Sequence, residues 1–250
     1  MAMVKDAEQI FPRPLSGDEV KSPPPALVPE RSVLKGRFID LEPLNAGTHT
    51  QELFQAGHSS DEALRIWDYL AYGPWPDEQT YAGILRAQSA SFDTIFYAVR
   101  SHETGKACGQ ASFLDIHPEN GVIEIGHIWF GPDLQRTRGA TEALFLMLKY
   151  AMDDLGYRRM QWRCNSLNAK SRQAARRLGF RFEGIFYNHL IFKGKNRDTT
   201  WYSILDDEWP EVRGIIEKWL SDENFAADGS PKSSLHAMME ARPQSERRIG

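Results

Sequence analysis

LQRTRGATEAL, residues 134–144, leads the chain out of a strand-like run and into a strongly apolar helical pattern. Along residues 140–155 the apolar side chains recur at the i, i+3, i+4, i+7 spacing of one buried helix face. Gly139 and Ala140 are small enough for a ligand to approach the backbone N–H groups at the positive end of this helix. The stretch is therefore compatible with a diphosphate-binding turn, and also with an ordinary strand-to-helix connection.

The segments around this stretch alternate between strand-like and helical patterns. Strand-like runs occupy residues 36–44, 92–100, 106–116, 122–130, 158–164, 180–192 and 199–205, and helical patterns occupy residues 47–57, 78–90, 139–155, 168–178 and 207–220. Short turns join the runs between residues 92 and 130 into an antiparallel meander, whereas the helix at 139–155 requires a crossover between parallel neighbours. We predict an α+β (α/β) fold with a mixed, mostly antiparallel central sheet of about seven strands flanked by helices.

The two ends of the chain differ in composition from its middle. Residues 1–31 are proline-rich and show no sustained period, and the chain after residue 221 is polar and interrupted by the turn-forming run at 228–231. We therefore expect a proline-rich arm at 1–31, one domain at 32–220 and a flexible tail at 221–250, with a short helical turn near residues 235–239.

The charge and the apolar runs argue against several partners. The net charge of −4 gives no basic footprint of the kind that nucleic acid requires. The longest apolar run, residues 143–148, is too short to span a membrane, and the first 14 residues lack the apolar core of a secretion signal. Cys108 and Cys164 lack the spacing of metal ligands, so we expect reduced thiols, no bound metal and a cytoplasmic location.

Two sets of motifs resemble those of the GNAT acetyltransferase superfamily. Gln135, followed by Arg138, Gly139 and Ala140, resembles the Q/R-x-x-G-x-G/A loop of that superfamily. Four further segments resemble motifs of the RimJ/RimL-like branch of the superfamily, and they occur in the right order within residues 34–206. They are EIG at 124–126, NSLNAKS at 165–171, LGF at 178–180 and EG at 183–184. The resemblance implies a GNAT-type sheet and an enzyme that transfers an acetyl group from acetyl-CoA to an amine.

The resemblance also implies which residues contact the coenzyme. They belong to the loop that opens the apolar helix, to the preceding strand and to the next helix, and they are Gln135, Arg136, Thr137, Arg138, Gly139, Ala140, Thr141, Ile128, Trp129, Phe130, Asn168 and Ser171. Arg138 departs from the motif, because the family usually has its first glycine there. We expect either a helical φ at Arg138 or a pyrophosphate held mainly by the amides of residues 139–141.

Three residues are candidates for proton transfer by the same resemblance. Ser171 is placed to protonate the leaving thiolate, Glu124 to order a water that removes the amine proton, and His189 to line the acceptor cleft as a proton carrier. Purely structural roles are also compatible with the sequence positions of these residues. Asn168 and Ser171 suit the N-cap and N3 positions of a helix, and Glu124 and His189 suit ordinary positions on strands.

The acceptor amine is the least determined part of the site. Trp67, Tyr69, Tyr72 and Trp75 surround Asp68 where the family builds its acceptor pocket, and such a group suits a cationic amine or ordinary core packing. The pattern of residues 193–198 predicts a hairpin turn. The three cations of this turn are also suited to binding an anionic acceptor.

The function that this sequence favours is direct transfer of an acetyl group from acetyl-CoA to a primary amine. A small-molecule amine, such as an amino acid or polyamine, is preferred over a protein N-terminus as the partner, because an aromatic cleft suits a small cation. The protein is expected as a monomer or homodimer. The alternative is a catalytically silent module that senses acetyl-CoA, and the presence of Ser171 and Glu124 weighs against it.

Overall fold

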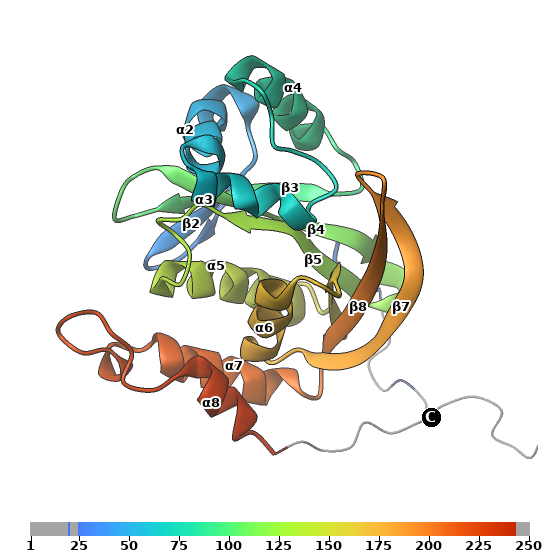
Figure 1. The fold of residues 1–250 in the computed structure, drawn as a ribbon. Helices are drawn as coiled ribbons and strands as arrows, with labels where there is room; N and C mark the ends of the chain where they lie inside the picture. The colour runs from blue at the N-terminus through green and yellow to red at the C-terminus, as the bar shows by residue number, and fades with distance from the viewer. Residues whose placement is uncertain (1–19, 21–24, 244–250) are drawn as a thin grey trace, which may run out of the picture.

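The computed structural model describes residues 20 and 25–243, and its centre is a sheet of eight strands with helices on both faces (Figure 1). The strands are β1 (Leu34–Lys35), β2 (Ile39–Pro43), β3 (Ile95–Ser101), β4 (Ala107–His117), β5 (Val122–Phe130), β6 (Arg159–Asn165), β7 (Arg181–Phe192) and β8 (Lys195–Leu205), in the spatial order β1-β2-β3-β4-β5-β6-β8-β7. All neighbours are antiparallel except β5 and β6, which are parallel. The predicted mixed, mostly antiparallel sheet is confirmed.

The helices follow the predicted order with a few additional short turns. They are α2 (Ala46–His58), α3 (Asp61–Leu64), η1 (Arg65–Tyr69), α4 (Glu78–Ser89), η2 (Pro118–Asn120), α5 (Arg138–Lys149), η3 (Tyr150–Asp154), α6 (Ala169–Arg177), α7 (Trp209–Leu220), η4 (Asp222–Asn224) and α8 (Leu235–Glu240). The apolar period of residues 140–155 is helical throughout, but its last part, η3, is a π-helical turn. Asp77 caps α4, and its side chain accepts the N–H of Thr80.

Two predicted boundaries are wrong. The strand expected at residues 36–44 is the shorter β2, and β1 precedes it as a separate strand, because the chain turns between them, where the Gly36 N–H donates to the Ile39 carbonyl at 2.9 Å. The turn expected at residues 193–198 is only Lys193-Gly194, with φ of 49° and 72°. Two successive positive φ values suit a tight hairpin, so β8 already begins at Lys195.

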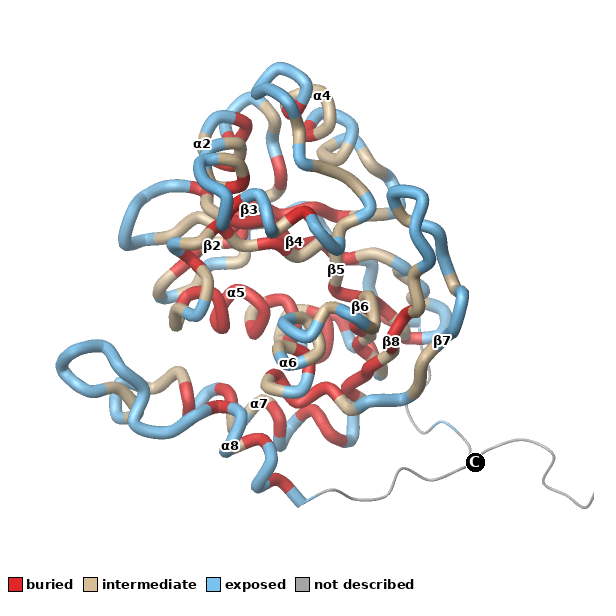
Figure 2. The backbone as a smooth tube through the Cα atoms, in the orientation of Figure 1, coloured by how far each residue is buried: buried red, intermediate tan, exposed pale blue. Residues whose placement is uncertain are grey.

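The core lies on both faces of the sheet, because alternate strand residues point to opposite sides. On one face Tyr97 and Val99 pack with the apolar stripe of α5, and on the other Phe96 and Ala98 pack with residues of α2, α4 and η1. Figure 2 shows the buried positions concentrated in α5 and the central strands. The sheet is thus held from both sides, which fixes the relative positions of β4, β5 and β6.

Part of the segment expected to be a flexible tail is packed on the domain. Leu235 and Met239 of α8 are buried, and Met239 lies over Gly179 at the end of α6. The guanidinium of Arg138 stacks on the ring of Phe225 at 4.1 Å. The division of the chain into arm, domain and tail remains a prediction, since residues 1–19, 21–24 and 244–250 lie outside the described residues.

Glu142 fixes the start of α5 against the turn between β1 and β2. Its carboxylate is 7% exposed and accepts the backbone N–H groups of Arg37, Phe38 and Ile39 at 2.9, 2.7 and 3.1 Å. Hydrogen bonds to a charged acceptor are stronger than neutral ones. One side chain therefore satisfies three backbone donors at the turn that precedes β2.

We predict that Glu142→Gln lowers the free energy of unfolding by about 2–3 kcal/mol, because an amide offers one oxygen and no charge to three donors. Urea unfolding followed by circular dichroism measures the difference. Glu211→Gln, at an exposed position of α7, is the matched control. Equal stability of the two variants would contradict the role assigned to Glu142.

Candidate active site

A gap in the sheet between β5 and β6 forms the frame of the site. These parallel strands pair over three residues only, Val122 with Arg159, Ile123 with Met160 and Glu124 with Gln161. Beyond Glu124 both strands continue, to Phe130 and to Asn165, without pairing with each other. The backbone edges that face each other across this wedge are available to a ligand or to water.

A bulge in β5 lies beside the wedge. Gly126 pairs with Ser112 and Trp129 with Gln110, so His127 and Ile128 together oppose the single residue Ala111 of β4. His127 has a φ of 50°, and the extra residue of a bulge is left outside the regular ladder. The bulge therefore aims backbone and side chains of β5 into the wedge.

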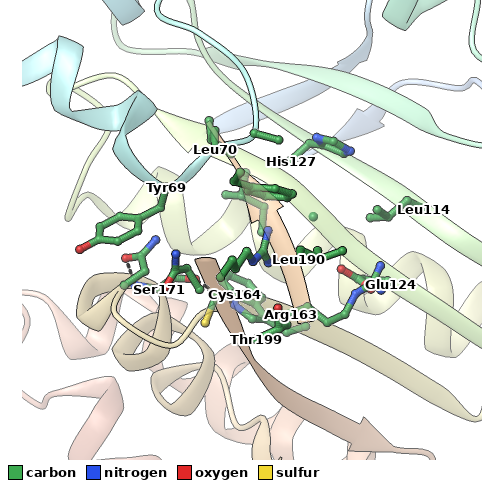
Figure 3. Close-up of a pocket in the computed structure, with 18 of the residues that line it drawn as sticks. Tyr69, Leu70, Leu114, Glu124, His127, Arg163, Cys164, Ser171, Leu190 and Thr199 are labelled. Atoms are coloured by element: carbon green, nitrogen blue, oxygen red, sulfur yellow. Dashed lines mark hydrogen bonds and ion pairs between the residues drawn. The ribbon is translucent and has the colours of Figure 1, made fainter. Parts of the chain in front are cut away.

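The wedge contains a pocket with a volume of about 300 Å³ (Figure 3). Its lining comes from β4, β5, β6, β7, β8, from the start of α6 and from the segment around η1: Ile66, Tyr69, Leu70, Ala71, Tyr72, Leu114, Glu124, Ile125, Gly126, His127, Ile128, Trp162, Arg163, Cys164, Asn165, Asn168, Ser171, His189, Leu190, Phe192, Arg197 and Thr199. The three predicted catalytic residues, Glu124, Ser171 and His189, meet in this one pocket.

Glu124 is a buried carboxyl that interacts with the charges of Arg163 and Arg197. It is 3% exposed, and its carboxylate forms an ion pair with Nε of Arg163, which also pairs with Asp115. Figure 3 shows Glu124 and Arg163 next to each other at one end of the pocket. Burial raises the pKa of Glu124 to about 7, against the opposing effect of Arg163. This carboxyl therefore changes its charge near neutral pH.

Ser171 and Asn168 lie at the start of α6, at the other end of the pocket. Asn168 caps the helix, since its side-chain oxygen accepts the backbone N–H of Ser171 at 3.1 Å. The hydroxyl oxygen of Ser171 accepts the indole N–H of Trp162 at 3.0 Å. The capping bond uses the backbone and not the hydroxyl, and the thiol of Cys164 lies within hydrogen-bonding reach of the Ser171 side chain.

His189 and Tyr69 line the pocket from different elements of the fold. His189 lies on β7, and its Nδ1 is 3.0 Å from Oγ1 of Thr199 on β8. Tyr69, at the end of η1, donates its hydroxyl proton to the Leu167 carbonyl at 3.2 Å and so bridges η1 to the loop before α6. The hydrogen bond to Thr199 fixes the orientation of the His189 ring within the lining.

The remaining aromatic candidates do not line the pocket. Trp67 is 1% exposed, and its indole N–H donates to the Gly57 carbonyl at 2.8 Å within the core. Trp129 packs against Trp67, with 5.3 Å between ring centroids. Trp75 stacks on Tyr72 behind the lining, and Asp68 is exposed on η1. The pocket therefore has fewer aromatic rings than the sequence suggested, and Asp68 adds no charge to its lining.

The loop at residues 131–137 joins β5 to α5 beyond the wide end of the wedge. Thr137 caps α5 and its hydroxyl takes the N–H of Ala140, so the N–H groups of Arg138 and Gly139 have no acceptor within the helix. The positive φ in this loop, 64°, belongs to Arg136, whereas Arg138 is helical. Of the two alternatives expected for Arg138, the structure has the helical φ. The N–H groups of Arg138 and Gly139 remain as two donors at the positive end of α5.

The side chains of this loop contribute mainly to its shape. Gln135 donates to the Phe130 carbonyl at 2.8 Å, and Thr141 is fully buried and accepts a hydrogen bond from Arg177 at 3.1 Å. A Cβ on Gly139 would lie 2.9 Å from Cγ2 of Ile39. Gly139 is thus required by the packing of α5 on β2, which is a different reason from the ligand approach expected from sequence.

A second, wider groove of about 1150 Å³ lies along α2 and the turn between β3 and β4. It includes the same loop and the start of α5, with Thr137, Arg138 and Gly139 in its lining. Glu52 and His102 are among its lining residues, and Glu52 is already paired with Arg100. The buried carboxyl and the predicted catalytic residues lie in the smaller pocket, which we therefore take as the candidate active site.

Sequence reasoning missed His127 and Arg163, and it gave Arg197 only as one of the three cations of residues 193–198. His127 stacks on Tyr72, and Nδ1 of its ring is 2.9 Å from the tyrosine hydroxyl; burial and the charge of Arg163 lower the pKa of this histidine. Arg163 and Arg197 bring the positive charge. His127 depends on a strand bulge, and a bulge is a register shift that leaves no mark in an apolar pattern.

In the part of the chain that the structure describes, no group of three or more histidine, cysteine or acidic side chains lies close enough to hold a metal ion. None of the helices among the same residues has both the length and the apolar character that crossing a membrane requires.

Comparisons with known proteins agree with this geometry. Residues 39–181 match the family model of the acetyltransferase (GNAT) domain. The chain is 30% identical over 173 residues to a Bacillus subtilis (strain 168) protein named as a ribosomal N-acetyltransferase, YdaF, covering 68% of this chain and 90% of that protein. A GCN5-related N-acetyltransferase structure from Brucella melitensis is 43% identical with a TM-score of 0.86, covering 88% of this chain and all of that one. A GNAT-family structure from Chromobacterium violaceum is 40% identical with a TM-score of 0.72, over 78% and 96% of the two chains.

The chain therefore belongs to the GNAT acetyltransferase family, and the similarity to YdaF supports the RimJ/RimL-like branch that the motifs indicated. It is an acetyltransferase, and the members of this family use acetyl-CoA.

We predict that Glu124 titrates with a midpoint near pH 7 in the folded protein. Because its pKa lies above the ordinary value of 4.5, the folded state holds this proton while the unfolded state loses it, so the carboxyl destabilises the fold increasingly as pH rises from about 5 to about 7. Infrared spectroscopy follows the protonated carboxyl band. Glu124→Gln should remove the band, and Asp115→Asn should lower its midpoint, because the Asp115 charge raises the pKa of Glu124. A midpoint near 4.5 in the wild type would contradict the assignment.

Proposed function

We propose that this protein transfers the acetyl group of acetyl-CoA to a primary amine of a small molecule bound in the pocket between β5, β6 and β8. The observation that carries the proposal is the separation of β5 and β6 beyond Glu124, which leaves an open wedge that contains Glu124, Ser171 and His127. A wedge of this kind accepts an extended ligand between two strands, whose free backbone groups replace the missing partner strand.

The residues around the wedge suit coenzyme A. The free N–H groups of Arg138 and Gly139 lie at the positive end of α5, where an anionic pyrophosphate is favoured. From Phe130 back to Gly126 the strand rises by roughly 13 Å, a length that an extended pantetheine arm spans. Acetyl-CoA bound in this way would supply the acetyl thioester at the pocket.

The residues of the pocket suit acetyl transfer to nitrogen. Attack forms a C–N bond and breaks the C–S bond, so one proton must leave the amine and one must reach the sulfur. Glu124, with its pKa near 7, accepts the amine proton directly or through a water, and the Ser171 hydroxyl donates to the thiolate. A backbone N–H of the bulge at His127 and Ile128 is available to the thioester oxygen as negative charge develops on it.

The pocket volume of about 300 Å³ favours a small amine as the acceptor. The relative named as a ribosomal N-acetyltransferase favours a second candidate, the N-terminus of a protein. A silent sensor of acetyl-CoA is supported less well, because the buried carboxyl and the hydroxyl needed for proton transfer share one pocket.

Release of free coenzyme A thiol from acetyl-CoA tests the proposal directly. The purified protein is assayed with amino acids, polyamines, aminoacyl conjugates and peptides that differ in their N-termini. We expect turnover with at least one class of small amine. Turnover with peptides alone would move the acceptor to protein N-termini. Tight binding of acetyl-CoA by calorimetry without turnover of any acceptor would favour the sensor.

We predict that Ser171→Ala lowers kcat by about 100-fold and leaves the affinity for acetyl-CoA within a factor of about three, because the hydroxyl acts on the leaving group. The N-cap of α6 survives, since Asn168 accepts the backbone N–H of residue 171. Calorimetry and initial rates separate the two effects. Ser89→Ala, a hydroxyl deletion near the end of α4, is the control. Full turnover by Ser171→Ala would exclude the proposed proton transfer.

A further inference from the structure

Arg197 is the arginine of the pocket for which the described part of the chain supplies no ion pair. It lies on β8, directly opposite Leu190 of β7, and both side chains line the pocket. Its guanidinium packs over the ring of Phe192 at 4.4 Å, and its Nε is buried without a hydrogen-bond acceptor. Across residues 20 and 25–243, Arg197 donates no side-chain hydrogen bond and forms no ion pair.

The side chains of the other cations near the pocket already form ion pairs or hydrogen bonds within the protein. Arg163 pairs with Glu124 and Asp115, and Lys193 donates to the Trp67 carbonyl at 2.7 Å. Burial lowers the pKa of Arg197, which shows that its surroundings penalise the charge, and Arg163 adds repulsion. A half-buried guanidinium in this position is stabilised best by an anion that enters the pocket.

The opposite charge in the pocket belongs to Glu124. Arg197 and Glu124 interact through their charges across the wedge, and neither contacts the other through a hydrogen bond. Between them the pocket offers a carboxyl for an amine and a planar, five-donor guanidinium for a carboxylate. The apolar walls come from Ile66, Leu70, Leu114 and Leu190.

We infer that the acceptor is an amine that carries a carboxylate close to its nitrogen, with that carboxylate bound by Arg197; an α-amino acid with an apolar side chain fits this description. This inference rests on the proposed function and narrows it. Of the acceptors that the sequence left open, it selects the amino acid over the polyamine, and Asp68, expected to attract the amine, lies outside the pocket lining. A peptide N-terminus lacks the neighbouring carboxylate unless a side chain supplies one.

Matched acceptors test the inference. Leucine and phenylalanine are compared with leucinamide and phenylalaninamide, which keep the amine and side chain and lose the charge. The wild type, Arg197→Gln and Arg197→Lys are assayed with each acceptor. Because amides and acids differ in amine basicity, the quantity compared is the ratio of variant to wild-type kcat/KM for each acceptor, in which basicity cancels.

We expect Arg197→Gln to lower kcat/KM at least 10-fold for the amino acids, mainly through KM, and less than twofold for the amides. Arg197→Lys should lie between, since an ammonium keeps the charge without the planar donors. Lys195→Gln, an exposed cation two residues away on β8, should change neither class. Equal ratios for acids and amides would overturn the inference while leaving the proposed function intact.

A binding measurement keeps the inference testable if no acceptor turns over. Calorimetry of N-acetylphenylalanine and its carboxamide is done with the protein saturated with coenzyme A. Stronger binding of the acid, lost in Arg197→Gln, supports the inference even where the proposed function has failed. Equal affinity of the two ligands, or binding of neither, contradicts it. Unchanged coenzyme A affinity and circular dichroism show that the variant is folded.

Discussion

The parallel contact between β5 and β6 extends over three residue pairs, and the rest of the site depends on where it stops. β5 is held along its other edge by β4, and β6 by β8, so the two strands are kept apart beyond Glu124 without loss of the sheet. The bulge at His127 adds an extra residue at the same place. The wedge is therefore a built-in interruption of the sheet whose free backbone groups require a partner.

The two ends of the wedge differ in their charged and polar groups. Its wide end leads to the N-terminus of α5, where two backbone N–H groups favour an anion. Its narrow end contains a carboxyl that changes charge near pH 7 and a pair of arginines, one paired and one free of partners among the described residues. Ser171 lies between these regions, on a helix whose cap holds its backbone. The arrangement suits a donor entering from the loop and an acceptor held by β5, β7 and β8.

Much of this fold could be predicted from sequence, and the site only in part. The period of residues 140–155 and the alternating strands predicted the sheet and its crossover helix, because burial imposes those periods. Glu124, Ser171 and His189 were found by resemblance and do share one pocket. His127 and Arg197 depend on a bulge and on a two-residue turn, which set register and not composition. Trp67 was expected in the acceptor pocket and lies in the core instead. The composition of an aromatic cluster is the same in a core and in a cleft, so the sequence does not distinguish them.

Hydrogen–deuterium exchange with and without saturating acetyl-CoA tests most directly whether the wedge is the binding site of the donor. We predict slower exchange at those amides of residues 125–130 that point away from β4 into the wedge, and at residues 138–139 at the start of α5. Slower exchange confined to α2 and the turn between β3 and β4, around the wider groove, with residues 125–130 unchanged, would contradict the account.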